Sequence, residues 1–263
     1  WTGGTMKGSG QTIIPSGKTL SISGSNNKTL ESRTLTNQGT VTLSGTGAVR
    51  LYYGPTISNQ SGGVFDVQGD VILDHYSGDY LTFTNAGTFL RSSGTGTATV
   101  EGIFNNTGTL EVQTGKVKLT HGGGTSSGQT TTVASGATLE FGGGTHTFSS
   151  GLTVANGTVK VSSGTMRMNG SSSLPAVVVT DGTLSANAAT TVQTVTLSGG
   201  YQAGTSSLTV NGSMSWTGGY LAGTGSTVIA SGATLSISGG VTKTLDARTL
   251  TNQGTVTLGS TVR

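Results

Sequence analysis

The sequence predicts an all-β protein that folds as a right-handed parallel β-helix (β-solenoid) of about 10–12 coils, with roughly 21–28 residues in each coil. Three observations predict this fold. Gly, Thr and Ser supply about half of the 263 residues, whereas only 9% are charged and 5% aromatic. Short segments alternate apolar residues with Thr or Ser, and the sequence that opens at Trp1 begins again at Trp216.

The composition excludes several other classes of protein. Gly and β-branched Thr form helices poorly, which excludes a helical bundle, and the low charge excludes a coiled coil. No apolar run approaches the roughly 18 residues of a membrane-spanning helix, so we expect no membrane span. The chain has no cysteine, which excludes a disulfide framework. Its 13 Lys and Arg are scattered rather than gathered in a basic stripe, so we expect no nucleic-acid partner.

The chain contains one long unit, residues 1–215, and the beginning of a second copy, residues 216–263. Over the first 44 residues of the two copies, 30 positions are identical, and residues 33–43 equal residues 248–258 letter for letter. We therefore expect one continuous solenoid over residues 1–263, cut from a longer tandem array.

A shorter and looser repeat lies inside the long unit. An apolar residue, a small polar residue or Asn, a Gly, a Thr and an alternating apolar pair recur, for example at residues 14–22, 35–43, 104–112 and 133–141. The alternation is typical of strands with one buried face, and strands this short must stack to bury it. Asn-Gly, Ser-Gly and Asp-Gly pairs are predicted to supply left-handed backbone angles at the bends. A narrow interior favours Val, Leu, Ile and Ala, in keeping with the few aromatic residues.

Asparagine recurs at the Asn-x-Gly corners of this pattern. The corner residues are Asn37, Asn85, Asn106 and Asn252. They either stack as a ladder of side chains along the solenoid or serve only the turns in which they lie. The sequence leaves both interpretations open.

The repeated phrases resemble those of a family of large bacterial proteins. Residues 35–43, 104–112 and 134–139 are similar to the repeats of filamentous-haemagglutinin-like and autotransporter-passenger-like adhesins. The resemblance extends over the whole chain through the style of its repeats, without a diagnostic motif. It implies a right-handed β-helix and an extracellular or cell-surface location, and it assigns no functional residue.

Carboxylates and aromatic rings gather in only one stretch, residues 66–80. The candidate ligand-binding residues there are Asp66, Asp70, Asp74, His75, Tyr76, Asp79 and Tyr80. Rings stack on sugar faces and carboxylates coordinate hard cations, which indicates a glycan or calcium site. The alternative is a bulged coil whose larger side chains fill a local gap. The spacing matches neither an EF-hand nor a nonapeptide calcium repeat, so no metal site is assigned.

Trp1 and Trp216 each open a copy of the long unit with Trp-Thr-Gly-Gly. They are candidate contacts between neighbouring chains, or else they cap a corner of their own coil. No nucleophile motif accompanies His75, His121 or His146, so the sequence assigns no catalytic residue and no cofactor.

The sequence thus predicts an extracellular structural protein rather than an enzyme. Copies of the chain would associate end to end or laterally into a stiff fibre, a stalk or a matrix. Two alternatives stay open. The chain could be an adhesin or lectin that binds glycans through residues 66–80, or a β-helix enzyme that cleaves polysaccharides.

Overall fold

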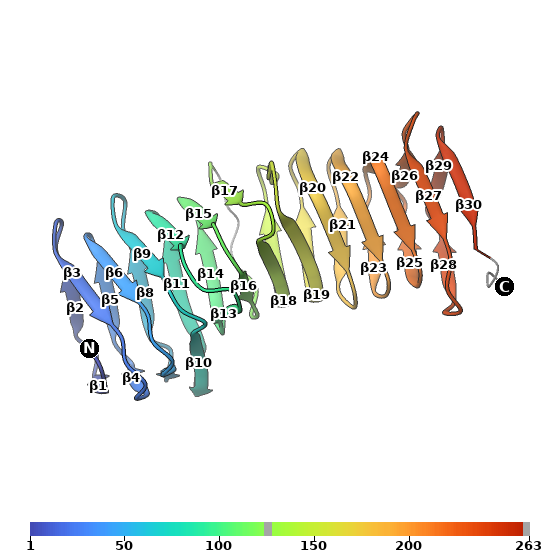
Figure 1. The fold of residues 1–263 in the computed structure, drawn as a ribbon. Helices are drawn as coiled ribbons and strands as arrows, with labels where there is room; N and C mark the ends of the chain where they lie inside the picture. Colours follow the sequence, from blue (N-terminus) through green and yellow to red (C-terminus); the bar gives the residue numbers. More distant parts are fainter. Residues whose placement is uncertain (124–127, 260–263) are drawn as a thin grey trace. The chain divides into compact units, whose positions relative to one another are not determined.

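The computed structural model describes residues 1–123 and 128–259. The chain forms two compact units, unit 1 (Trp1–Leu139) and unit 2 (Glu140–Arg263). In both units parallel strands stack as a β-solenoid (Figure 1), and the described residues wind about 12 turns without a helix. Accordingly, these residues include no helix of the length and hydropathy that crossing a membrane requires. The predicted parallel β-solenoid is confirmed.

Unit 1 folds into three parallel sheets, to which nearly every turn contributes one strand each. Sheet A contains β1 (Gly4–Lys7), β4 (Lys28–Glu31), β7 (Val49–Tyr52), β10 (Ile72–Ser77), β13 (Thr97–Val100) and β16 (Lys116–Leu119). Sheet B contains β2 (Gln11–Ile14), β5 (Thr34–Asn37), β8 (Thr56–Asn59), β11 (Leu81–Asn85) and β14 (Gly102–Asn106). Sheet C contains β3 (Thr19–Ile22), β6 (Thr40–Leu43), β9 (Val64–Val67), β12 (Thr88–Arg91), β15 (Thr109–Val112) and β17 (Thr130–Val133).

Equivalent residues of successive turns stack on one another in the core of unit 1. Leu35, Ile57, Phe83 and Phe104 occupy one register position of sheet B and are all buried. Four buried phenylalanines pack together, with 5.0 Å between the ring centroids of Phe65 and Phe83. Val, Leu, Ile and Ala make up most of the buried core, as the sequence predicts, and this cluster of rings is added to them. Each buried ring contributes about 1.5–3 kcal/mol through removal of its surface from water.

The corner after sheet B carries a buried ladder of asparagine side chains. Asn37 donates from Nδ2 to Asn59 Oδ1 over 2.7 Å, Asn59 donates to Asn85 over 2.7 Å, and Asn85 donates to Asn106 over 2.7 Å. Asn106 in turn donates to Gln129 Oε1 over 3.3 Å. The ladder interpretation is correct for three of the four predicted residues, and Asn59 joins them although it lies outside the Asn-x-Gly pattern.

Asn252 serves only its own turn. Its Oδ1 accepts from the Gly254 amide, and its Nδ2 donates to the Gly254 carbonyl, each over 3.2 Å. Asn37, which occupies the equivalent position of the first copy, accepts the same bond from Gly39 but gives its Nδ2 to the next turn. The ladder interpretation thus applies to Asn37 and the turn interpretation to Asn252, although the two residues occupy equivalent positions.

Two kinds of glycine shape the corners. Gly17, in a Ser-Gly corner, has a φ of +73°, as the sequence predicts. Gly87, in an Asn-x-Gly corner, is not left-handed, and a Cβ at this position would lie only 2.2 Å from the Gly63 carbonyl oxygen. Glycine is required there because the backbones of successive turns approach closely. The predicted left-handed angle is absent at Gly182, in the Asp181-Gly182 pair, so that expectation does not hold for every such pair.

Unit 2 is also a stack of parallel strands, several of which continue around a corner. The chain enters it within β18 (Thr138–Phe148), so the boundary between the units differs from the repeat boundary at Trp216. Its further strands are β19 (Thr158–Met168), β20 (Ser172–Val179), β21 (Thr183–Ala186), β22 (Thr190–Leu197), β23 (Tyr201–Ala203), β24 (Ser207–Trp216), β25 (Gly219–Ala222), β26 (Ser226–Ile229), β27 (Thr234–Ile237), β28 (Lys243–Asp246), β29 (Thr249–Asn252) and β30 (Thr255–Leu258).

Some turns of unit 2 are shorter than the sequence predicts. Val159 pairs with Val177, and Val177 pairs with Val195, so each of these turns falls below the predicted range. The predicted range assumed that one turn extends from one corner glycine to the next. In unit 2 this spacing does not correspond to single turns, because long strands such as β19 continue around a corner without interruption.

The two copies of the long repeat pair their strands in the same register. Gly4 pairs with Lys28 in the first copy, and Gly219 pairs with Lys243 in the second. The same equivalence holds for β2 on β5 and β26 on β29, and for β3 on β6 and β27 on β30. The sequence repeat is therefore a structural repeat.

The two equivalent asparagines give a matched test of the ladder. We expect Asn37→Ala to lower the free energy of unfolding by about 2–3 kcal/mol, because it leaves buried amide groups of the ladder without partners. Asn252→Ala removes the same side chain at an exposed position and should cost about 0.5 kcal/mol or less. Urea unfolding of the two variants measures both. Equal losses in the two variants would contradict a stabilising ladder.

Candidate functional site: a ring surface on unit 1

Four tyrosines and two histidines gather on the surface of unit 1. Three of the tyrosines are strongly exposed, Tyr53 and Tyr76 at 56% each and Tyr80 at 41%. We call the group the ring surface. It comprises Tyr52, Tyr53, His75, Tyr76, Tyr80 and His121.

A bulge in β10 places Tyr76 on the outside. His75 pairs with Leu51 and Ser77 pairs with Tyr52, so the register shifts and Tyr76 has no partner residue in β7. A bulge adds one residue to a strand and redirects its side chain. The structure thus contains the bulged coil that the sequence left open as an alternative, and this bulge exposes an aromatic ring.

Tyr53 occupies a strained corner. Its φ is +55°, in the left-handed region that bulky residues rarely adopt. The same corner of the preceding turn has Ser32, at +47°, and that of the following turn has Gly78, at +79°. The Tyr53 amide donates to the Ser77 carbonyl over 2.9 Å, which ties the corners together. A left-handed residue with a Cβ costs about 1–2 kcal/mol, so a large ring at this position points to a use for the ring.

The tyrosine half of the surface lies on β7 and β10. The ring centroids of Tyr52 and Tyr76 are 4.9 Å apart, and those of Tyr52 and Tyr53 are 6.2 Å apart. The guanidinium carbon of Arg50 lies 5.0 Å from the centroid of Tyr76, within range of a cation–π interaction. This contact holds Tyr76 by one side and leaves more than half of the residue open to solvent.

The histidine half is a stack of three rings. Tyr80 lies between His75 and His121, with centroid distances of 3.9 and 3.8 Å. The Glu101 carboxylate accepts from the His75 backbone amide over 3.1 Å. Burial lowers the pKa of His121, the nearby charge of Glu101 opposes this shift, and His75 adds to it. His121 is therefore held toward its neutral form, which suits ring stacking.

The structure divides the seven predicted residues into two groups. His75, Tyr76 and Tyr80 belong to the ring surface, and Asp74 lies beside Arg50 in the register of β10 on β7. The Asp79 carbonyl accepts from the Gly54 amide over 2.9 Å, at the corner next to Tyr53.

Asp66 and Asp70 form contacts of their own, away from the rings. Asp66, on β9, accepts from Gln68 over 2.7 Å and from the hydroxyl of Ser92 over 2.5 Å. The carboxylates of Asp66 and Asp70 thus bond groups of adjacent turns and of their own loops.

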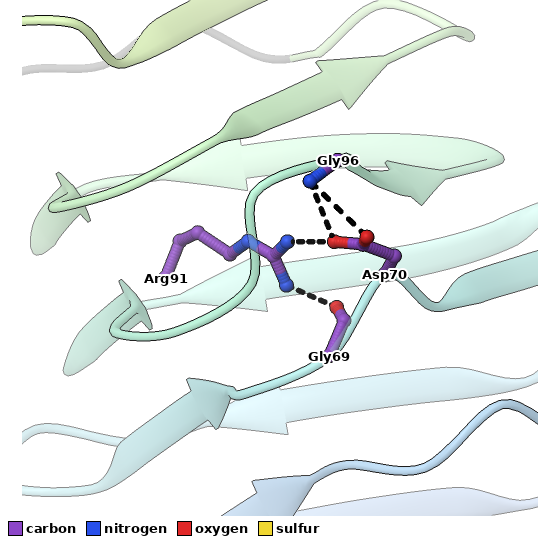
Figure 2. A network of polar contacts seen from close by, with 4 residues as sticks. All are labelled: Gly69, Asp70, Arg91 and Gly96. Atoms are coloured by element: carbon purple, nitrogen blue, oxygen red, sulfur yellow. Dashed lines mark hydrogen bonds and ion pairs between the residues drawn. The ribbon is translucent and has the colours of Figure 1, made fainter.

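Asp70 neutralises a buried arginine (Figure 2). Arg91, on β12, is fully buried and bonds the Asp70 carboxylate over 2.5 Å and the Gly69 carbonyl. The Gly96 amide also donates to both oxygens of Asp70, over 3.0 and 3.1 Å. The network joins a loop of one turn to the following turn, and its role is to stabilise the fold.

Sequence reasoning missed four members of this neighbourhood. Arg50, Tyr52 and Tyr53 come from the preceding turn, and His121 follows β16. A signal for the first three existed, since residues one turn earlier in the chain lie beside residues 74–80. Because β10 has a bulge and the turns differ in length, the neighbours of His121 in the adjacent turns cannot be derived from its position in the sequence.

The two tryptophans have different surroundings. Trp216, at the end of β24, is only 5% exposed and its indole donates to the Gly219 carbonyl over 3.4 Å, which leaves little of it for a neighbouring chain. Trp1 lies beside β3, where its carbonyl accepts from the Ser23 amide over 3.1 Å and its amino group donates to the Ser21 carbonyl.

Comparison with protein-family models found no match, and comparisons with curated proteins and solved structures found no significant match. Across residues 1–123 and 128–259, no cluster of three or more His, Asp or Glu is arranged to hold a metal ion.

The two partners of the Asp70–Arg91 pair should respond differently to mutation. Asp70→Ala leaves a buried guanidinium without its carboxylate and should cost about 3 kcal/mol of unfolding free energy. Arg91→Met leaves a carboxylate that is 49% exposed and can be hydrated, so its cost should be about 1 kcal/mol. Denaturant unfolding measures both, and a larger cost for Arg91→Met would contradict this assignment.

Proposed function

We propose that the chain is a structural element of an extracellular or cell-surface fibre, stalk or matrix, and that its role is mechanical rather than catalytic. The observation that carries the proposal is the in-register repeat. The unit that begins again at Trp216 rebuilds the same strand pairing, which suits a chain extended by adding turns.

The interactions within the turns suit a load-resisting element. Most interior strands are hydrogen-bonded to the strands of the turns before and after them, as β5 is to β2 and β8. The asparagine ladder adds side-chain bonds in the same direction. With 9% charged residues, the surface carries little charge that would repel a neighbouring copy. The resemblance to repetitive bacterial surface proteins supports the same location and role.

Electron microscopy together with surface labelling tests this proposal. We expect purified protein to form filaments, and antibodies against it to label intact producing cells. A protein that stays monomeric at high concentration and neither forms filaments nor attaches to surfaces would contradict the mechanical role. Labelling that requires cell lysis would contradict the extracellular location.

A second candidate function is glycan binding through the ring surface. The observation that favours it is the exposure of three tyrosines in the ring surface, one of them held in a strained corner. Exposed rings next to hydrogen-bonding groups are suited to the apolar faces and hydroxyl edges of sugars. Asp79 and Arg50 lie beside these rings.

A glycan array on wild type and on Tyr76→Ala/Tyr80→Ala tests the second function. We expect the double variant to lose about tenfold or more in affinity if both rings stack on sugar. Asp66→Asn is the matched control, since Asp66 lies in the same stretch but away from the rings. Equal binding by wild type and the double variant, or no binding to any glycan, would overturn the function.

A further inference from the structure

The ring surface differs in charge from the chain as a whole. The chain has 13 Lys and Arg against 10 Asp and Glu, which gives it a formal excess of positive charge. Three carboxylates nevertheless lie at the ring surface: Asp74 on β10, Asp79 beside the corner of Tyr53, and Glu101 directly after β13. The ring contacts themselves include the guanidinium of Arg50. This local excess of carboxylates favours a positively charged ligand.

Arg50 does not neutralise the carboxylate beside it. Arg50 and Asp74 are opposite each other in the register of β7 and β10, yet within residues 1–123 and 128–259 no ion pair joins their side chains. The Nε atom of Arg50 is buried without a hydrogen-bond partner, and the guanidinium carbon lies 5.0 Å from the centroid of Tyr76. The Tyr76 ring thus already accepts a cation on one face, and the charge of Asp74 is left for another cation.

Asp79 is fixed by its backbone, which leaves its carboxylate for a ligand. Its carbonyl accepts from the Gly54 amide over 2.9 Å, and its side chain is exposed. A Cβ at Gly54 would lie 3.1 Å from the Asp79 Cβ, so this side chain crosses the corner that holds Tyr53. A Cβ at Gly78 would lie 2.7 Å from Cδ1 of Tyr53, so glycine lets that ring lie against the next turn. A carboxylate and an exposed ring therefore share one corner.

Glu101 supplies a carboxylate to the histidine half of the ring surface. Its Oε2 accepts from the His75 amide over 3.1 Å, and its charge opposes the lowering of the His121 pKa that burial causes. Both imidazoles stack on Tyr80. Each half of the ring surface therefore combines aromatic rings with at least one carboxylate.

The charged residues next to this group do not reverse its sign. Glu31 lies beside Tyr52 in the register of β4 on β7, and Lys7 lies beside Glu31, so these two charges offset each other. Lys118 lies in the same sheet, on β16. Counting Lys118 together with Arg50 still leaves three carboxylates against two cations.

We propose that the ring surface binds a glycan that carries free amino groups, of the kind formed by glucosamine units without their acetyl groups. The inference rests on glycan binding, the second candidate function, and names the class of glycan. The tyrosine rings stack on the apolar faces of the sugars, and the ammonium groups lie next to Asp74 and Asp79 or over open ring faces. A neutral glycan uses the rings alone, whereas the carboxylates repel a glycan of uronic acids.

An amino sugar fits this surface better than other cations do. It carries an apolar face and an ammonium group on the same rigid ring, and the surface offers tyrosine faces and carboxylates side by side. A lysine side chain has the ammonium group on a flexible stem and no flat face for the tyrosines. The pairing of rings with carboxylates therefore favours the sugar.

Binding of matched oligosaccharides to the full chain tests the inference. The probes are a tetramer of glucosamine, the same tetramer fully N-acetylated, and a tetramer of uronic acid. We expect calorimetry to give a Kd about tenfold lower for the glucosamine tetramer than for its N-acetylated form, because each exposed ion pair or cation–π contact contributes up to about fivefold. The uronic acid tetramer should bind weakest. Added salt should weaken the glucosamine tetramer and leave the N-acetylated one unchanged.

Single substitutions separate the carboxylates from the rings. Asp74→Asn and Asp79→Asn should each weaken binding of the glucosamine tetramer by about two- to fivefold and leave the N-acetylated tetramer unchanged. Asp181→Asn is the matched control, since it removes an exposed carboxylate of unit 2, and it should change neither. Tyr76→Ala/Tyr80→Ala should weaken both tetramers.

The outcomes distinguish the inference from the function on which it rests. Equal affinity for the glucosamine and N-acetylated tetramers, or an equal loss in Asp181→Asn and Asp79→Asn, would overturn the inference and leave glycan binding in place. Failure to bind any of the tetramers would overturn both. A tetralysine peptide that binds as tightly as the glucosamine tetramer would also overturn the inference, because the ammonium group alone would then account for binding.

Discussion

Short strands can bury a face only against the strands of adjacent turns, and the rest of the structure depends on this constraint. A four-residue strand such as β5 carries two inward residues, too few to form a core alone. Stacking at a spacing of about 4.8 Å aligns the inward residues of successive strands into continuous columns of Leu, Ile and Phe. The column of Leu35, Ile57 and Phe83 shows how side chains of different size share one position once the register is fixed.

Polar groups in the interior follow the same constraint. A buried carboxamide or guanidinium is tolerated because the next turn supplies its partner at a fixed height. Asn59 meets Asn85, and Arg91 meets Asp70, each across one turn. Interior turns are therefore self-consistent, because each turn supplies the hydrogen-bonding partners that its neighbours need.

The ring surface forms where the stacking is least regular. β10 has a bulge, the turn that follows it is long, and the left-handed corner holds a tyrosine beside turns that use Ser32 and Gly78. Regular turns place Thr or Ser outward, which gives a uniform surface. The irregular turn breaks that uniformity and offers several aromatic faces close together. Local departures from an otherwise repetitive rule are where binding groups are expected.

The sequence by itself determined the parallel solenoid and the copy that begins at residue 216. The alternation of apolar and polar residues and the repeated segment are properties of the chain itself, so they do not depend on how the turns are arranged. Only the tertiary structure decided which equivalent residues are core and which are surface. Asn37 and Asn252 share their local sequence, yet one lies in a buried ladder and the other in an open turn. The tertiary structure also gave Asp70 a partner in Arg91, apart from Tyr76, and placed His121 against Tyr80. The physical reason is that burial and partnership come from the neighbouring turn, whose register depends on bulges and turn lengths that residue types do not specify.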